Sequence, residues 1–492
     1  MTQYSTLGAV DLGSNSFHLA IGRVVGEQVY PLDSLKETVR LGAGIDADKR
    51  LDDEVQERAL AALRRFSERL AGMPRESVRV VGTNALRVAK NSAQFVRKAE
   101  ATLGFPIEVI SGREEARLIY TGVVHSLPMV DDNRLVVDIG GGSTEFIIGQ
   151  KLKPRTMESL YMGCVSYTAR DFPGGKIEKK SMKNAELAAR EQVQTIAERF
   201  EKVGWKEAVA SSGTARSLAE VMQKNGMAER GINAAGLEWL REELLKAGEV
   251  KKLALEGLRE DRVPVVAGGA AIMSAVFAEL GLEQMTVAEG ALRDGVLWDL
   301  LGRVHHRDIR EVTVDQLMQT YHVDVAQADR VRLVALQLLK HIAPDAAEQL
   351  VTFLDWAARL HEIGISIAQG AYHKHSAYIL AFADMPGFSR QEQGYLSNLV
   401  LAQRGKLSKM REAFDDDPRL ATLAFCLRVA VIFHRSRRSF TLPRLSAESR
   451  PNGYRMRIAR EWLEDQTLVS HALDEEREQW ESVGLKLELE ET

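Results

Sequence analysis

The chain has 492 residues, of which 45% are hydrophobic and 27% charged, and its formal net charge is −4. This composition is that of a globular protein, and the length exceeds one ordinary core, so several domains are expected. The only cysteines, Cys164 and Cys426, exclude a disulfide framework and favour a reducing compartment, so we expect a cytoplasmic protein.

Strands and helices alternate over the first 125 residues. Short apolar runs bounded by turns predict strands, and a 3.6-residue periodicity predicts helices. The predicted strands cover 7–10, 17–25, 29–41, 78–81 and 107–110, and the predicted helices cover 52–70, 84–103 and 114–125. The resulting order, βββαβαβα, is that of an α/β domain.

Much of this order recurs after Asp138. We expect strands at 135–138, 145–150, 155–162 and 208–211, a helix at 182–202, and further helices beyond. The matching positions lie 127 residues apart. This spacing is far longer than a solenoid repeat, so it indicates the duplication of a whole domain.

Strands are no longer expected from about residue 303. The segments 328–342 and 417–433 have helical patterns, whereas 454–463 and 485–490 indicate a small mixed tail. The fold class is therefore α/β, with two copies of one domain followed by an all-α domain and a small α+β domain. The predicted domains cover 1–125, 126–302, 303–440 and 441–492.

No membrane segment is expected. Asp11 interrupts the first apolar run before a signal sequence could form. The longest uncharged run, 263–278, has 16 residues and contains Pro264 and two glycines, so it predicts a buried strand and helix rather than a span. We expect no stable membrane association.

Two similar loops carry the strongest functional signal. VDLGSNS at 10–16 matches VDIGGGS at 137–143, and each places an aspartate at the end of a strand before a turn of small residues. A backbone without bulky side chains can approach phosphate oxygens, and consecutive N–H groups can donate to them. One such loop alone could be an Asx-turn that closes a hairpin. The pair instead predicts a phosphate clamp made of Ser14, Asn15, Ser16, Gly140, Gly141, Gly142 and Ser143.

The clamp is not a Walker nucleotide site. That motif requires GxxxxGK[ST] between a strand and a helix, but here GGK at 174–176 is followed by Ile177. The two loops instead run from strand to strand.

Carboxylates accompany these loops without a nearby basic residue. Asp11, Asp138 and Glu145 are the candidates, and we expect them to hold Mg²⁺, which takes one or two protein oxygens beside phosphate.

A further carboxylate lies in ISGREEARLIY, at 110–120. Ser111 and Glu114 form the S-x-x-E pattern of a capping box, which leaves Glu115 without a structural task. Glu115 could simply complement the helix dipole. Its position between the two loops in the chain instead suggests a base that activates water.

Three other turns follow strands and precede helices. GTNALR at 82–87 supplies Arg87, whose guanidinium suits phosphate, although an isolated surface arginine would be ordinary. SSGTA at 211–215 supplies Ser212, Gly213 and Thr214 as phosphate-binding candidates, and AGGAA at 267–271 resembles it. Such turns can also serve only close packing of helices.

Charge is unevenly distributed near the C-terminus. Residues 404–460 contain 14 Lys and Arg against 5 Asp and Glu, whereas 461–492 contain 2 against 11. The basic segment suggests an anionic partner, and the alternative is that the two segments pair with each other. Binding of nucleic acid through 404–460 is a remaining alternative, but we do not expect it.

Taken together, DLGSNSFH, GTNALR, SGREEARLIY, DIGGGSTE, SSGTA and LHEIG, in this order, resemble the exopolyphosphatase / guanosine pentaphosphate phosphohydrolase family. This family belongs to the actin-like ATPase superfamily, and the resemblance runs from residue 7 past residue 435. It implies two actin-like (ribonuclease H-like) domains with a cleft between them, a helical HD-like domain and a small fourth domain. It also implies a homodimer.

The resemblance implies removal of terminal phosphate from inorganic polyphosphate, or conversion of pppGpp to ppGpp. Glu115 matches the family's catalytic base, Asp138 and Glu145 match its metal ligands, and Arg87 matches a phosphate contact. DIGGGSTE and a long basic track favour polyphosphate. A regulator that binds nucleotide without turnover is a further alternative, which the retained Glu115 argues against.

The HD-like region departs from the pattern of metal-dependent HD enzymes. LHEIG places Glu362 where an aspartate is expected, and His434 stands where a late aspartate is expected. We therefore do not expect an independent metal site there. Arg435, Arg437 and Arg438 are instead predicted to line a channel for a long polyanion.

Overall fold

The structure is a computed structural model that describes residues 4–304, 308–438 and 442–492. The chain forms two compact units, Met1–Asp308 and Ile309–Thr492. Each unit is described by itself below. The division into four smaller domains stays a prediction, and its boundary near residue 440 lies outside the described residues.

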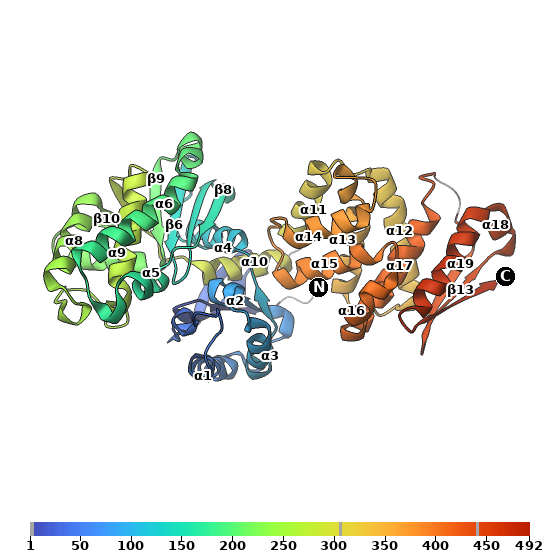
Figure 1. Ribbon diagram of the computed structural model, residues 1–492, viewed down its shortest axis with the longest axis horizontal. Helices are drawn as coiled ribbons and strands as arrows, with labels where there is room; N and C mark the ends of the chain where they lie inside the picture. Colours follow the sequence, from blue (N-terminus) through green and yellow to red (C-terminus); the bar gives the residue numbers. More distant parts are fainter. Residues whose placement is uncertain (1–3, 305–307, 439–441) are drawn as a thin grey trace. The chain divides into compact units, whose positions relative to one another are not determined.

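The first unit contains two sheets of the same construction (Figure 1). The first sheet has the order β3-β2-β1-β4-β5, and the second has the order β10-β11-β9-β6-β7-β8. In each sheet an antiparallel meander of three strands joins a parallel pair through its first strand. The strands of the first sheet are β1 Thr6–Leu12, β2 Ser16–Val25, β3 Gln28–Thr38, β4 Val78–Gly82 and β5 Ile107–Val109. Those of the second are β6 Asn133–Ile139, β7 Thr144–Gln150, β8 Lys153–Leu160, β9 Glu207–Ser211, β10 Ile232–Asn233 and β11 Gln284–Val287.

Two helices lie between the sheets. α4 (Gly112–His125) and α10 (Leu292–Val304) share one apolar core with inward residues of both sheets, such as Ala9 and Val136. Each helix follows the outermost strand of the parallel part of its own sheet, β5 or β11, so the two helices are equivalent in the duplication. This equivalence confirms the predicted α/β fold with a duplicated domain.

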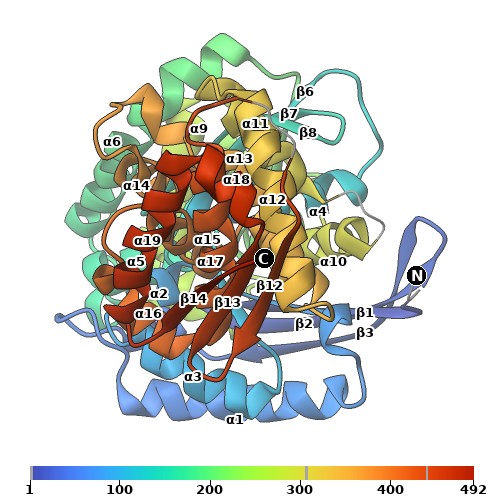
Figure 2. The same cartoon turned by 90° about the vertical axis from the view of Figure 1, so that its right-hand side faces the viewer.

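The outer face of each sheet carries its own helices (Figure 1). The first sheet packs against α1 (Asp53–Leu70), α2 (Asn84–Val88) and α3 (Ser92–Leu103), and Figure 2 shows α1 and α3 along one side of it. The second packs against α5 Cys164–Asp171, α6 Lys179–Val203, α7 Ser212–Lys224, α8 Ala234–Ala247 and α9 Val266–Glu279. Burial of these faces supplies the main stabilisation of the unit.

Glycines allow α4 and α10 to touch through their backbones. A Cβ atom on Gly122 would lie 2.1 Å from the carbonyl oxygen of Ala291, and one on Gly295 would lie 1.8 Å from that of Leu118. Real Cβ atoms do not approach backbone this closely, so only glycine fits at these two positions.

Three sequence predictions of local structure were wrong. The predicted helix 84–103 is broken between α2 and α3, where the Asn91 side chain instead bonds both backbone groups of Leu51. The run 263–278 contains a 3₁₀ turn and most of α9, and no strand. Nearly all faces of this helix are buried, so its residues are apolar throughout and lack the periodicity that would have distinguished a helix from a strand. Strand β11 was missed because it is only four residues long, Gln284–Val287.

The second unit combines a helical part with a small sheet. Its helices are α11 Ile309–Thr320, α12 Val325–Ile342, α13 Glu348–Leu360, α14 Tyr372–Phe382, α15 Arg390–Ala402, α16 Arg411–Asp416, α17 Pro418–Phe433, α18 Arg460–Asp465 and α19 Thr467–Glu481. The strands β12 Leu445–Arg450, β13 Gly453–Ile458 and β14 Lys486–Glu491 pair in that order. Tyr454 and Trp480 of this C-terminal part share a core with Phe425 of α17.

The basic and acidic C-terminal segments pair with each other. Arg428 binds Glu476 in the core, Arg455 lies 2.7 Å from Glu488, and Arg457 lies 2.7 Å from Glu490. The alternative of mutual pairing therefore accounts for part of the charge asymmetry. Among the described residues, no helix is both long and apolar enough to cross a membrane.

Candidate active site

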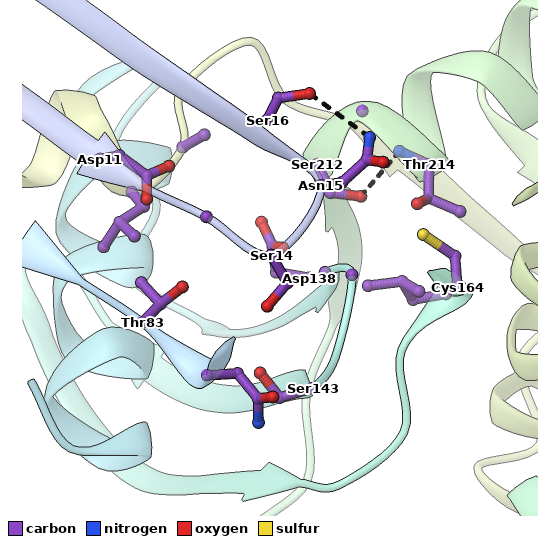
Figure 3. Close-up of a pocket in the computed structure, with 18 of the residues that line it drawn as sticks. Asp11, Ser14, Asn15, Ser16, Thr83, Asp138, Ser143, Cys164, Ser212 and Thr214 are labelled. Carbon is purple, nitrogen blue, oxygen red and sulfur yellow. Dashed lines mark hydrogen bonds between the residues drawn. The ribbon is translucent and has the colours of Figure 1, made fainter. Parts of the chain in front are cut away.

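The two predicted phosphate loops lie beside each other and line one cavity of about 110 Å³ (Figure 3). A Cβ atom on Gly141 would lie 2.9 Å from Cβ of Ser14, and one on Gly142 would lie 2.4 Å from Oδ1 of Asn84. The loop between β6 and β7 therefore lies directly against the loop between β1 and β2. Glycine at these positions is required by this close approach.

Every predicted clamp residue lines this cavity. Ser14, Asn15, Ser16, Gly140, Gly141, Gly142, Ser143, Ser212, Gly213 and Thr214 all contribute, together with Thr83 and Asn84 at the start of α2. The Ser14 hydroxyl accepts a hydrogen bond from the backbone N–H of Ala85 at 3.2 Å, so the first loop caps α2. Thr83, the residue at the N-cap position of α2, makes no capping bond with its own side chain.

The third turn of the site is held in an unusual conformation. Ser212 has a φ of 89°, which non-glycine residues rarely adopt, and its hydroxyl accepts from the N–H groups of Thr214 and Ala215 at 3.2 Å. The AGGAA segment does not form a comparable turn. It lies within α9, where a Cβ on Gly269 would meet Thr214, so its glycines serve close packing.

Acidic side chains occupy one part of the cavity. Asp11, Glu115 and Asp138 line it, whereas Glu145 lies just behind, where it accepts a hydrogen bond from the Ser159 hydroxyl at 2.8 Å. Burial raises the pKa of Asp138 to about 6, with Glu115 adding to the effect. Burial, together with Glu115, also raises the pKa values of Asp11 and Glu145 well above their ordinary range.

These carboxylates have the donor chemistry for Mg²⁺. Within the described parts of the chain, Oδ1 of Asp11 is buried without a hydrogen-bond partner, and a cation would relieve the repulsion between the acidic groups. No group of three or more His, Cys, Asp or Glu side chains in those parts is arranged to hold a metal ion by itself. A cation here would need phosphate and water oxygens to complete its coordination.

Three arginines also line the cavity, and they were missed in the sequence. Arg216, Arg262 and Arg293 line it. They come from α7, from the turn before α9 and from the start of α10, so no local motif connects them. Arg216 directly follows SSGTA, which is the one signal that could have found it. A Cβ on Gly213 would lie 2.1 Å from Nη2 of Arg262, so this arginine lies against the third turn.

A second hollow shares these arginines. It is lined by Lys36, Arg216, Arg259, Arg262 and Arg293, with His18 and Glu220 also contributing. Burial, followed by the positive charges of Arg293 and Lys36, lowers the pKa of His18 to about 3. The imidazole is therefore neutral at pH 7, and the hollow is electropositive.

Glu114 and Glu115, adjacent in the first turn of α4, point to different surroundings. The Ser111 hydroxyl accepts from the N–H of Glu114 at 3.1 Å, which is the Ser111 half of the predicted capping box. The Glu114 carboxylate accepts two hydrogen bonds from Arg117, each 2.8 Å long. The Glu115 carboxylate instead reaches the cavity and is paired with Arg87 at 2.7 Å.

The predicted channel residues lie just after α17, in the second unit. Arg435, Arg437 and Arg438 are exposed. Arg437 pairs with Asp324 and, through both oxygens, with Glu362. His361 is buried, and burial lowers its pKa. Whether these arginines guide a polyanion stays a prediction.

Most of the chain matches two models of one protein family. Residues 20–304 match the Ppx/GppA phosphatase family, and residues 309–477 match domain III of the Ppx/GppA phosphatases. The chain belongs to the Ppx/GppA phosphatase family. The resemblance drawn from the motifs is thereby confirmed.

Solved structures agree with this membership. An exopolyphosphatase from Cytophaga hutchinsonii is 27% identical, with a TM-score of 0.56, and the match covers 61% of this chain and 98% of that one. An exopolyphosphatase-like protein is 25% identical, with a TM-score of 0.56, over 61% and 99% of the two chains. A Ppx/GppA family member from Aquifex aeolicus, at 22% identity and a TM-score of 0.51 over 61% and 98%, shares the fold.

Proposed function

We propose that this family member is an exopolyphosphatase, which hydrolyses the terminal phosphoanhydride of inorganic polyphosphate and releases orthophosphate. One observation carries the proposal: two loops of glycine, serine and asparagine line a cavity that contains both carboxylates and arginines. The same arginines also line the second hollow. A chain of phosphates fits this arrangement. The two loops can bind its terminal phosphate, and the arginines can bind the negative charges of the phosphates that follow.

The terminal phosphoryl group would lie in the cavity that both loops line, where backbone N–H groups of the loops can donate to its oxygens. Glu115 would orient a water molecule and take its proton as the water oxygen attacks phosphorus. The bond from phosphorus to the bridging oxygen then breaks, and the shortened chain leaves with that oxygen. Arg216, Arg262 and Arg293 would hold the charge of the following phosphates.

Mg²⁺, held by Asp11 and Asp138 with Glu145 behind them, would add positive charge against the phosphate oxygens. Without such a cation, the acidic side of the cavity repels the substrate.

Hydrolysis of pppGpp to ppGpp is the second candidate. The second hollow contains one carboxylate, Glu220, among its cations. The N1–H and amino group of guanine are donors that suit a carboxylate. A guanosine polyphosphate could therefore use the same hollow for its base and its distal phosphates.

Phosphate release from polyphosphate, pppGpp and ATP at equal concentration tests this proposal. We expect the fastest release from polyphosphate, loss of release with EDTA, and recovery on adding Mg²⁺. Faster release from pppGpp would favour the second candidate. Absence of release from all three substrates, or equal rates with EDTA, would contradict the proposed hydrolase.

A further inference from the structure

Arg87 lies behind the proposed base rather than in the phosphate cavity. Its Nη1 atom is 2.7 Å from Oε2 of Glu115 and 3.0 Å from the carbonyl oxygen of Ile110. Both side chains of the pair are about nine-tenths buried, with 11% and 10% exposed. Glu115 lines the cavity, whereas Arg87 is not among the described residues that line it.

The surroundings of Arg87 hold the guanidinium in this place. Its Nη2 atom would lie 3.9 Å from a Cβ on Gly112, so the guanidinium packs against the first turn of α4. The positive charge of Arg87 also favours the ionised form of Glu145, which lowers the pKa of that carboxyl against the larger effect of its burial. Arg87 is thus in contact with Glu115 and acts electrostatically on Glu145 as well.

The ion pair also selects one oxygen of the base. Oε2 of Glu115 is engaged by Arg87, while Oε1 has no hydrogen-bond partner within the described parts of the chain. A carboxylate fixed through one oxygen presents its other oxygen in a constant direction. This arrangement is what a base that must orient a single water requires.

We propose that Arg87 is a positioning residue for Glu115 and not a ligand of the substrate phosphate. The proposal rests on the proposed phosphohydrolase function and specifies how that site works. Arg87, carried by α2, fixes the carboxylate of α4, while Arg216, Arg262 and Arg293 are left to bind the polyanion.

Two kinds of experiment separate this role from phosphate binding. The first is a double-mutant cycle of phosphate release with Arg87→Gln, Glu115→Gln and the double variant. We expect Arg87→Gln to lower kcat at least about tenfold with KM within about twofold, and to have no further effect once Glu115 is replaced. A raised KM, or losses that multiply in the double variant, would overturn the proposal.

The second experiment is equilibrium binding of tripolyphosphate, measured by calorimetry, and it does not depend on turnover. Arg87→Gln should change the Kd by less than about threefold, whereas Arg262→Gln, the matched arginine that lines the cavity, should raise it at least about tenfold. Equal losses in both variants would assign Arg87 to the phosphate and overturn the proposal.

Two controls complete the design. Arg87→Lys keeps the charge but loses the planar guanidinium that packs against Gly112, so partial recovery of kcat relative to Arg87→Gln is expected, and thermal melting checks that each variant is folded. A wild-type protein that binds tripolyphosphate but releases phosphate from no substrate would count against the proposed function alone. The binding comparison would still decide the role of Arg87.

Discussion

Two neighbouring glutamates of α4 show how differently one protein can bury negative charge. Glu114 lies in a network in which every carboxylate faces guanidinium groups, whereas Glu115 lies with other carboxylates at the cavity. The network consists of Glu108, Glu114, Asp299, Arg79, Arg117 and Arg303. Its formal charges cancel, which is the condition under which buried ions are tolerated.

The pKa values of two buried aspartates, Asp299 and Asp138, show the same contrast. Burial alone would raise the pKa of Asp299, but Arg117 and Arg79 outweigh it and hold the pKa below the ordinary value. Burial raises the pKa of Asp138 to about 6, and the negative charge of Glu115 adds to the effect. The charges of the network balance one another within the folded chain. The carboxylates of the cavity raise one another's pKa values instead, as is common at sites that bind a further charged group.

Breaking the balanced network should have the largest effect. Glu114→Gln leaves Arg117 buried with one carboxylate fewer, so we expect unfolding free energy to fall by roughly 3–5 kcal/mol. Urea unfolding at pH 7 measures this change. Glu207→Gln is the matched control, since it also pairs with a buried arginine, Arg134, but its own side chain is 37% exposed. A loss no greater than that of the control would show that the network does not hold α4.

Replacing the neighbouring glutamate should affect turnover instead. Glu115→Gln should release phosphate at roughly a hundredth of the wild-type rate or less, because it removes the proposed base. Its unfolding free energy should fall by less than that of Glu114→Gln, because loss of the ion pair with buried Arg87 is partly offset by the removal of one of several mutually repelling carboxylates. Initial rates and urea unfolding on the same preparation test both parts. Unchanged turnover would remove Glu115 from the mechanism.

Burial of His18 among positive charges should make the free energy of unfolding depend on pH. His18 has a folded pKa of about 3 against 6.5 for the free side chain, so the unfolded state binds more protons between these values. Stability is therefore lost as pH falls below 6.5, by about 2 kcal/mol between pH 7 and pH 5. His18→Gln should remove this part of the slope in urea unfolding. An unchanged slope would mean that the surrounding arginines do not oppose protonation.

The facing loops could be predicted because they are local and duplicated. Asp11 and Asp138 each end a strand, and equal strand orders place equal loops at equivalent positions. Arg216, Arg262 and Arg293 could not be found this way, since three separate elements bring them together. The break after α2 was missed for a similar reason, because its cause is a distant contact between Asn91 and Leu51.

In the second unit, the count of charged residues in the sequence predicted their binding partners poorly. The excess of arginine at 404–460 suggested a polyanion partner, but Arg428, Arg455 and Arg457 bind glutamates supplied by the following segment. A sequence count cannot show which opposite charges meet. The arginines after α17 remain candidates because Arg435 and Arg438 are exposed.

The backbone contact between α4 and α10 has a consequence for tolerance to substitution. Gly122 and Gly295 touch neither loop of the cavity, yet an alanine at either would force the helices apart by a large part of a methyl diameter. Because these helices separate the two sheets, such a wedge would also widen the opening between the loops that the sheets carry. The spacing of the reactive groups thus depends on the absence of a side chain at Gly122 and at Gly295.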